Sequence, residues 1–226
     1  MIEIAPSVLS ADFLDLGRQV REVLSEKVAR LHVDVMDGHF VPNLSMGPRV
    51  VECLKPLADE FNAKLDVHLM VTDPARHIEA FVQAGAAVVT VQLETHAHLE
   101  RLTGRVRELG ASVGVAISPA TPLIALEEIV SQIDQVLVLT VSPGFAGQRF
   151  LDWTVDKVAR LRRLLRQRGL EHVVIEVDGG IHRDTIGSVV RAGADIAVVG
   201  SGVFEGPDSI SENLRCLREA ANEAST

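Results

Sequence analysis

Short apolar runs rich in β-branched residues recur eight times along the chain. They lie at residues 2–9, 28–36, 63–70, 87–93, 112–117, 135–141, 172–177 and 195–200. Between them, apolar residues are spaced as on one face of a helix. One such face is formed by Leu14, Leu16, Val20, Val23 and Leu24. Strand and helix alternating over the whole length indicate βα units with parallel strands. We therefore predict an α/β fold, a (β/α)8 TIM barrel in a single domain over residues 1–226.

Turn residues support the same alternation. Four glycines lie between a helical segment and the next strand, as C-terminal caps do: Gly85, Gly110, Gly169 and Gly193. Asp73-Pro74 and Thr121-Pro122 each resemble a helix N-cap followed by proline. A doubly wound open sheet is the alternative, but no G-x-G-x-x-G motif follows the first apolar run.

The amino-acid composition limits which kinds of molecule the protein is expected to bind. The chain has 226 residues, with 22 Lys and Arg against 31 Asp and Glu, so its formal charge is −9. An acidic surface argues against nucleic acid or an anionic membrane as partner, but it permits a small anionic ligand. The two cysteines, Cys53 and Cys216, lie far apart, which suits a reducing cytoplasm. The N-terminus lacks the pattern of a signal peptide, and no apolar run reaches the roughly 18 residues of a membrane-spanning helix.

Ionisable residues interrupt three of the apolar runs near their ends. The pairs are His32 and Asp34, Asp66 and His68, and Glu176 and Asp178. Side chains two residues apart on a strand point to the same face, so all three pairs should face the barrel interior. Active sites of such barrels lie at the C-terminal ends of the strands. One pair alone is equally compatible with a buried structural ion pair.

Three converging pairs favour a bound cation, because burying so many ionisable groups without one costs several kcal/mol each. His32, Asp34, His68 and Asp178 form a mixed nitrogen and oxygen set that suits Zn²⁺, Fe²⁺, Mn²⁺ or Co²⁺. The other histidines lie in loops, in helices or at strand starts, and we expect them on the surface. They are His39, His77, His96, His98, His172 and His182.

Glycine-rich loops follow the last three apolar runs, at residues 142–148, 178–180 and 200–202. Glycines let backbone N–H groups approach an anion closely, and barrels often bind phosphate after strands seven and eight. Tight turns alone would explain any one of these loops. Three neighbouring ones favour a phosphate-sized anion.

Five segments carry a resemblance to a known family: PSVLSAD at 6–12, HVDVMDGHFVPN at 32–43, DVHLM at 66–70, PGFAGQ at 143–148 and EVDGG at 176–180. They closely resemble the ribulose-phosphate 3-epimerase family, from about residue 3 to residue 205. The resemblance implies a (β/α)8 barrel that binds one divalent metal and interconverts ketose phosphates epimeric at C3, most readily D-ribulose 5-phosphate and D-xylulose 5-phosphate. It implies no organic cofactor, and a homo-oligomer, either a dimer or a hexamer.

The resemblance also implies roles for individual residues. The metal ligands are His32, Asp34, His68 and Asp178, and the two aspartates are the catalytic acid and base. Ser7, His68, Met36 and Met70 contact the substrate; Gly144, Phe145, Ala146 and Gly147 form a loop that closes over it; and Gly179, Gly180, Gly200 and Ser201 bind its phosphate.

Several positions depart from the family pattern. Gln92 stands where many members have His, Ser142 and Ser118 where Asn is common, and Leu139 where Met is common. Ala146 makes the loop similar to that of D-allulose-6-phosphate 3-epimerases, so this sugar is an alternative substrate. A phosphate-binding decarboxylase would be expected to carry a lysine near the strand ends, but Lys64 begins its strand. A non-catalytic sugar-phosphate sensor is the remaining alternative.

Overall fold

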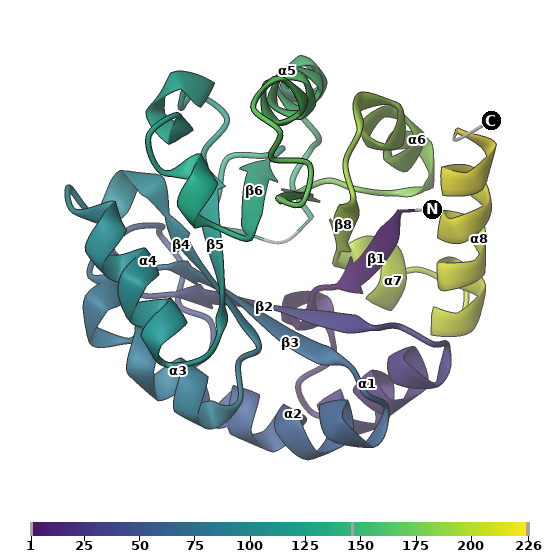
Figure 1. Ribbon diagram of the computed structural model, residues 1–226. Coiled ribbons are helices and arrows are strands. Elements are labelled where there is room, and N and C mark those ends of the chain that lie inside the picture. Colours follow the sequence, from purple (N-terminus) through teal and green to yellow (C-terminus); the bar gives the residue numbers. More distant parts are fainter. Residues whose placement is uncertain (1, 146, 225–226) are drawn as a thin grey trace.

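Eight parallel strands form the centre of the computed structural model, which describes residues 2–145 and 147–224 (Figure 1). The strands are β1 Glu3–Pro6, β2 Arg30–Met36, β3 Lys64–Met70, β4 Val88–Gln92, β5 Ser112–Ile117, β6 Gln135–Leu139, β7 Val174–Asp178 and β8 Ile196–Val199. Their order is β1-β8-β7-β6-β5-β4-β3-β2, and a parallel bridge between Ser7 and His32 joins the two ends. The predicted (β/α)8 barrel is confirmed.

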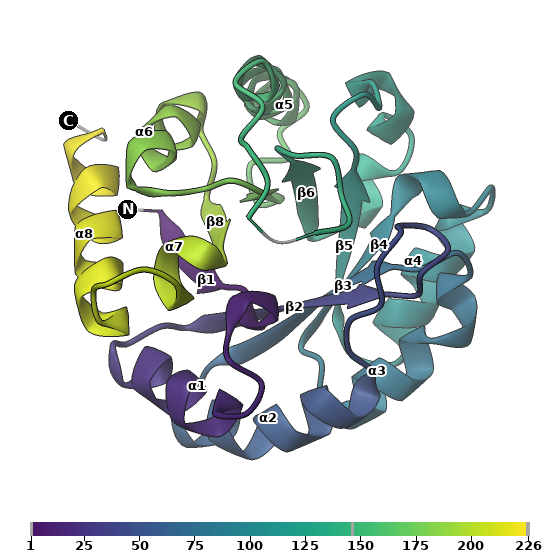
Figure 2. The same cartoon turned by 180° about the vertical axis from the view of Figure 1, so that it is seen from behind.

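Helices surround the strands on the outside (Figures 1 and 2). Within the described residues they are α1 Leu16–Ser25, α2 Pro48–Glu60, α3 Ile78–Ala84, α4 Leu99–Glu108, α5 Thr154–Gln167, α6 Arg183–Ala192, α7 Ser201–Phe204 and α8 Ile210–Glu223. Short 3₁₀ turns lie at η1 Val8–Ser10, η2 Pro74–Arg76, η3 Leu93–Thr95, η4 Leu123–Leu126 and η5 Val130–Gln132. The connection from β5 to β6 therefore consists of 3₁₀ turns in place of a regular helix.

Successive side chains along each strand point alternately to the core under the helices and to the interior of the barrel. On β2, which is buried over its full length, Leu31, Val33 and Val35 belong to the large apolar core between strands and helices. Arg30, His32 and Asp34 occupy the other face, toward the barrel interior. Strand register then sets the layers, because His32 pairs with Asp66 and Asp34 pairs with His68. The apolar core between strands and helices fixes the strands, and their inward-facing polar groups therefore lie together inside the barrel.

Close packing inside the barrel restricts one position on β5 to glycine. A Cβ at Gly114 would lie 2.1 Å from the hydroxyl oxygen of Thr90 on β4. This contact is far shorter than any real Cβ contact, so only glycine lets the two strands pair here.

The predicted glycine caps are confirmed in part, but two predicted helix starts are wrong. All four expected glycine caps adopt positive φ, and Gly85 and Gly193 are themselves left-handed C-caps of α3 and α6. Leu14 was expected on the core face of a helix, but α1 begins only at Leu16 and Leu14 is 99% exposed. Thr121-Pro122 precedes a 3₁₀ turn, whose N-cap is Pro122, and not a regular helix. Pattern alone did not identify where each helix begins.

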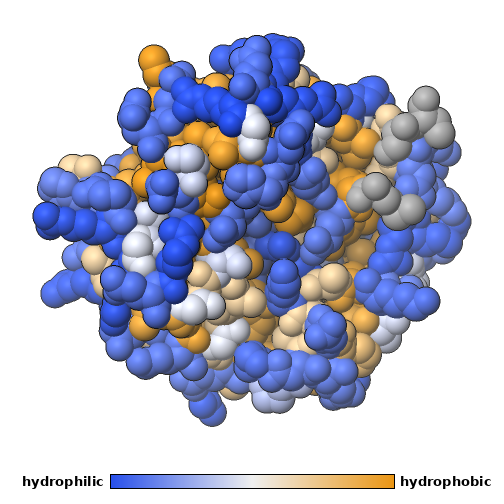
Figure 3. Space-filling model, viewed as in Figure 1, coloured by the Kyte–Doolittle hydropathy of each residue, from blue (hydrophilic) through white to orange (hydrophobic). Residues whose placement is uncertain are grey.

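The surface is mixed in character. On the face shown in Figure 3, hydrophilic residues cover most of the outer rim and hydrophobic residues are visible between them. No helix in the described part of the chain is both long and apolar enough to cross a bilayer.

Candidate active site

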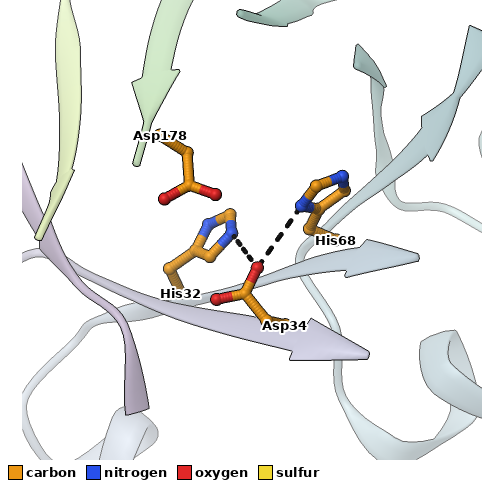
Figure 4. Close-up of side chains that lie close together, drawn as sticks. All are labelled: His32, Asp34, His68 and Asp178. Atoms are coloured by element: carbon orange, nitrogen blue, oxygen red, sulfur yellow. Dashed lines mark hydrogen bonds and ion pairs between the residues drawn. The ribbon is translucent and has the colours of Figure 1, made fainter. Parts of the chain in front are cut away.

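Four side chains from three strands converge at the C-terminal end of the barrel interior (Figure 4). His32 and Asp34 come from β2, His68 from β3 and Asp178 from β7, and one ligand atom of each lies within 4.8 Å of the others. Asp34 Oδ1 lies 3.3 Å from His32 Nε2 and 3.4 Å from His68 Nδ1. Strand register and barrel closure thus bring together residues that lie far apart in the sequence.

The two aspartates of this cluster have opposite electrostatic environments. Burial by itself would raise the pKa of Asp34, but the neighbouring His32 and His68 lower that pKa far below its usual range. Burial, followed by the charge of Asp34, raises the pKa of Asp178 to about 8. The histidines therefore favour the ionised form of Asp34, whereas burial favours the protonated form of Asp178, and opposite preferences of this kind suit proton transfer in both directions.

The pKa values of the two histidines are also shifted in opposite directions. Burial opposes a charge on His32, but the carboxylates around it, Asp34 first, raise its pKa well above the ordinary value. Burial lowers the pKa of His68, which favours a neutral imidazole. A neutral imidazole has one ring nitrogen with a free lone pair, as a metal ligand requires.

The cluster fits a divalent cation. Both ring nitrogens of His32 are buried and lack a hydrogen-bond partner among the described residues. Two imidazoles and two carboxylates are the donor types that zinc and the neighbouring transition metals prefer. The unpartnered ring nitrogens and the composition of the set fit a metal centre.

A second polar layer lies below the first along the same strands. Arg30 and Gln135 donate hydrogen bonds within it, but Asp66 Oδ1 and Glu176 Oε1 have no partner among the described residues. Arg30 donates to Asp66 Oδ2 at 2.7 Å and to Gln135 Oε1 at 3.0 Å. Gln135 in turn donates to Glu176. His32, Asp66 and Glu176 also lie close enough together to ligate a cation, but Arg30 already supplies a positive charge there.

Ser7 and two methionines border the four-residue cluster. The Ser7 hydroxyl donates to Asp34 Oδ2 at 2.7 Å. Met36 and Met70 pair in register at the ends of β2 and β3, and both are buried beside Val41. Apolar thioethers at this place exclude water from the carboxylates, which strengthens the electrostatic interactions within the site.

A pocket opens directly above the cluster and has about 580 Å³ of empty space, including the part open to solvent. Most of the predicted site residues line it: Ser7, Asp34, Met36, Met70, Gly144, Phe145, Gly147, Asp178, Gly179, Gly180, Gly200 and Ser201. His32 and His68 lie beneath it, fully buried. Ala146 lies outside the described residues. Asp34, Asp178 and the glycine loops therefore line one pocket, with His32 and His68 beneath it.

The turn after β7 can contain only glycine at its second position. Gly180 has φ of +64°, and a Cβ there would lie 2.6 Å from the backbone nitrogen of Phe150. The absent side chain lets this backbone line the pocket, which suits close approach to an anion.

Sequence reasoning missed some residues of this pocket. His182 was expected on the surface, but it lines the pocket and is the N-cap of α6. His182 lies two residues after Gly180, directly behind the second glycine-rich loop and at the start of a helix, and this position was a signal in the sequence. Leu9 and Ser10 also line the pocket, in the turn that follows β1.

The departures from the family pattern lie in different places. Gln92 is buried beside His68, with its Nε2 3.0 Å from His68 Nε2, and Leu139 lines the pocket. Ser118 lies directly after β5, and its N–H donates a hydrogen bond to Glu94 in η3, the turn that follows β4. Lys64 is exposed at the first residue of β3, at the opposite end of the barrel from the pocket.

Fold and site together define a (β/α)8-barrel enzyme whose carboxylates and imidazoles meet at the C-terminal ends of the strands, the usual place for catalysis in this fold. Comparison with known proteins identifies the family. The model of the "Ribulose-phosphate 3 epimerase family" matches residues 3–204. The chain belongs to the ribulose-phosphate 3-epimerase family and is an isomerase.

Individual relatives agree. The ribulose-phosphate 3-epimerase of Bacillus subtilis is 42% identical over 90% of this chain and 93% of its own. The chloroplastic ribulose-5-phosphate-3-epimerase of Arabidopsis thaliana is 43% identical over 99% of this chain and 78% of its own. The Escherichia coli K12 ribulose-phosphate 3-epimerase is 40% identical over 91% of this chain and 90% of its own.

Solved structures with low sequence identity share the fold. The 3-hexulose-6-phosphate synthase of Salmonella typhimurium is 16% identical, with a TM-score of 0.72 over 99% of this chain and 100% of its own. The 3-keto-L-gulonate-6-phosphate decarboxylase of Vibrio cholerae is also 16% identical, with a TM-score of 0.71 over 98% of both chains. At this identity the likeness extends to the barrel architecture alone.

Proposed function

We propose that this enzyme interconverts D-ribulose 5-phosphate and D-xylulose 5-phosphate by inverting C3. The observation that carries the proposal is the pair Asp34, which is buried, and Asp178, which is half-buried: two carboxyl groups with opposite pKa shifts that line one pocket. Inversion at carbon needs a base on one side of a planar intermediate and an acid on the other. One ionised and one protonated carboxyl group provide both.

The C3 proton of a 2-ketose phosphate is acidic because the negative charge left by its loss is delocalised onto the oxygen of the C2 carbonyl, which gives an enediolate. In one direction Asp34 accepts this proton, and Asp178 delivers another to the opposite face of C3. In the other direction the two exchange roles, so each turnover leaves the pair ready for the reverse reaction. Only protons move, and the proposal requires no redox or organic cofactor.

His32, Asp34, His68 and Asp178 would hold one divalent ion, zinc, iron, manganese or cobalt. When bound, such an ion supplies Lewis-acid stabilisation of the negative charge that develops on the substrate oxygens. Ser7 supports the proposed base by donating to the second oxygen of Asp34. The hydroxyl keeps that oxygen oriented while the first faces the two histidines.

The rest of the pocket would hold the substrate. We assign the phosphate to the backbone of Gly179, Gly180, Gly200 and Ser201, and the closing loop to Gly144, Phe145, Ala146 and Gly147. Met36, Met70 and His68 would border the sugar carbons. The oligomer is proposed to be a dimer or a hexamer, which light scattering of the purified protein would distinguish, and the enzyme to act in the cytoplasm.

The decisive experiment is turnover of D-ribulose 5-phosphate in D₂O, followed by proton NMR. We expect D-xylulose 5-phosphate labelled with deuterium at C3. A panel with D-allulose 6-phosphate tests the alternative sugar, and a higher kcat/KM on that substrate would replace the pentulose assignment. Tight binding of these phosphates with neither label nor product would instead identify a sensor and reject the proposal.

A further inference from the structure

Gln92 is buried at the end of β4 with an unused hydrogen-bonding atom. Its side chain lies on the same strand face as Thr90, toward the barrel interior, and the residue is 0% exposed. Its Nε2 faces His68 Nε2 at 3.0 Å, while its Oε1 has no hydrogen-bond partner among the described residues. A buried amide oxygen without a donor costs free energy, so its presence needs an explanation.

His68 turns different nitrogens to its two neighbours. Nδ1 lies toward Asp34 in the four-residue cluster, and Nε2 lies on the far side of the ring (Figure 4). A ring nitrogen that ligates a cation carries no proton, so a neutral ring then carries its proton on the other nitrogen. With Nδ1 committed to the cluster, Nε2–H is a donor and requires an acceptor.

The oxygen of Gln92 is the acceptor within reach. A half-turn of the side-chain amide exchanges its oxygen and nitrogen without changing its shape. We infer that Gln92 is a positioning residue that accepts the Nε2–H of His68 through Oε1 and so holds Nδ1 free to bind a divalent cation. This inference rests on the proposed function, because it assigns His68 to the metal site.

The arrangement has a direct physical consequence. Metal-binding histidines usually donate their second N–H to a carboxylate, a carbonyl or water, and loss of that acceptor weakens metal binding by about 10–100-fold. A neutral amide at this place orients the ring without adding another negative charge to a cluster that already holds two aspartates. Gln92 would therefore act on metal affinity through ring orientation, with no contact to the substrate.

The test measures Co²⁺ affinity by competition with a chelating dye, together with the visible absorption spectrum of the Co²⁺-loaded protein. Gln92→Met keeps the length of the side chain but removes the acceptor, and Gln92→Glu keeps an acceptor and lacks a donor. Thr90→Val is the matched control, because Thr90 lies two residues earlier on the same strand face and pairs in register with His68, but its hydroxyl accepts a hydrogen bond from Gln135 and makes none with His68. Thermal unfolding of each metal-free variant reports whether it folds, and Gln92→Leu repeats the test if the Met variant does not.

We expect Gln92→Met to bind Co²⁺ about 10–100-fold more weakly, with a changed visible spectrum. Gln92→Glu should bind at least as tightly as the unaltered enzyme, and Thr90→Val should match it. The negative charge of Glu also attracts a cation, so the size of the effect on Co²⁺ affinity is taken from the Gln92→Met variant.

Two outcomes would overturn the inference while leaving the proposed function intact. One is wild-type affinity and spectrum in Gln92→Met. The other is a loss in Gln92→Glu as large as in Gln92→Met, which would show that a donor is required there. Failure of the unaltered enzyme to bind Co²⁺, Zn²⁺ or Mn²⁺ would reject the metal centre of the proposed function, and the role of Gln92 with it.

Discussion

The barrel interior contains two polar layers, and the buried carboxylates of each layer are balanced by different partners. In the lower layer Arg30 supplies a cation to Asp66 and donates to Gln135, and Glu3 approaches the same guanidinium at 3.2 Å. In the upper layer Asp34 faces the imidazoles of His32 and His68 in place of a guanidinium. Both ring nitrogens of His32 lack a hydrogen-bond partner among the described residues, as do Asp66 Oδ1 and Glu176 Oε1 of the lower layer. Buried charge is tolerated only when it is paired, and a divalent cation held by these imidazoles and carboxylates would complete the pairing in the upper layer.

His32 connects the two layers. Its Nε2 lies 3.3 Å from Asp34, while its Nδ1 lies 3.6 Å from Glu176 Oε1. Burial, with the charge of Asp66, raises the pKa of Glu176 to about 7. The lower layer thus has a structural role with one functional consequence, because it orients a residue that the upper layer uses.

The largest expected effect comes from metal removal. If the upper layer needs an external cation, dialysis against a chelator should abolish epimerisation, and Zn²⁺, Mn²⁺, Fe²⁺ or Co²⁺ should restore it. The measurement is a coupled assay for D-xylulose 5-phosphate, with metal content determined by elemental analysis. Full activity in metal-free protein would show that the layer around Asp34 and Asp178 does not need a bound cation.

Next in size is the loss of either aspartate in the upper layer. Asp34→Asn and Asp178→Asn should each reduce net epimerisation by about 10²–10⁴-fold, the usual contribution of a positioned acid or base. Each metal-loaded variant should still exchange the C3 proton with solvent deuterium without inversion, and each should do so on the opposite epimer. Exchange of the same epimer by both, measured by NMR after metal content is checked, would rule out the two-base assignment.

In the lower layer the expected effect is on stability. Arg30→Met leaves Asp66 buried without its cation, which should destabilise the fold by about 3–5 kcal/mol. Arg21→Met is the control, because Arg21 pairs with Glu60 at the surface, where such pairs contribute about 1 kcal/mol or less. Urea unfolding measures both. Equal losses in the two variants would show that the lower layer does not depend on its internal cation.

The smallest effect concerns Asp37, a carboxylate at the barrel mouth that is satisfied by neither a metal nor an arginine. It accepts backbone N–H bonds from Thr72 at 2.7 Å, His39 at 2.8 Å and Phe40 at 2.9 Å. Burial opposes its charge, but these bonds lower its pKa well below the usual range. A lowered pKa in the folded state stabilises the protein above the unfolded pKa of about 4, and this contribution is lost as the pH falls below that value.

Asp37→Asn should therefore cost about 1–3 kcal/mol at pH 7, the range for hydrogen bonds to a charged group. Its difference from the unaltered protein should shrink as the pH falls below about 4. Thermal unfolding midpoints between pH 3 and pH 7 measure this. A difference that is constant over that range would mean that the charge of Asp37 contributes nothing.

The sequence alone predicts the architecture and the central chemistry, because both follow from short-range periodicity. Eight apolar runs separated by helical spacing favour a barrel over a doubly wound sheet, and positions two apart on one strand share a face. Hence His32, Asp34, His68 and Asp178 are expected to point inward before any contact is known. The family resemblance adds roles for residues such as Ser7, but these roles stay predictions until they are tested.

Only the tertiary structure distinguishes the two polar layers. Asp66 and Glu176 share the strand pattern of His68 and Asp178, but Arg30 and Gln135 reach them from other strands. Similarly, His182 reaches the pocket and Leu14 remains exposed because the neighbouring elements, not the local pattern, decide what each side chain contacts. Periodicity determines which way a side chain points, whereas pairing, pKa and access depend on neighbours that are distant in the sequence and become close only when the barrel closes.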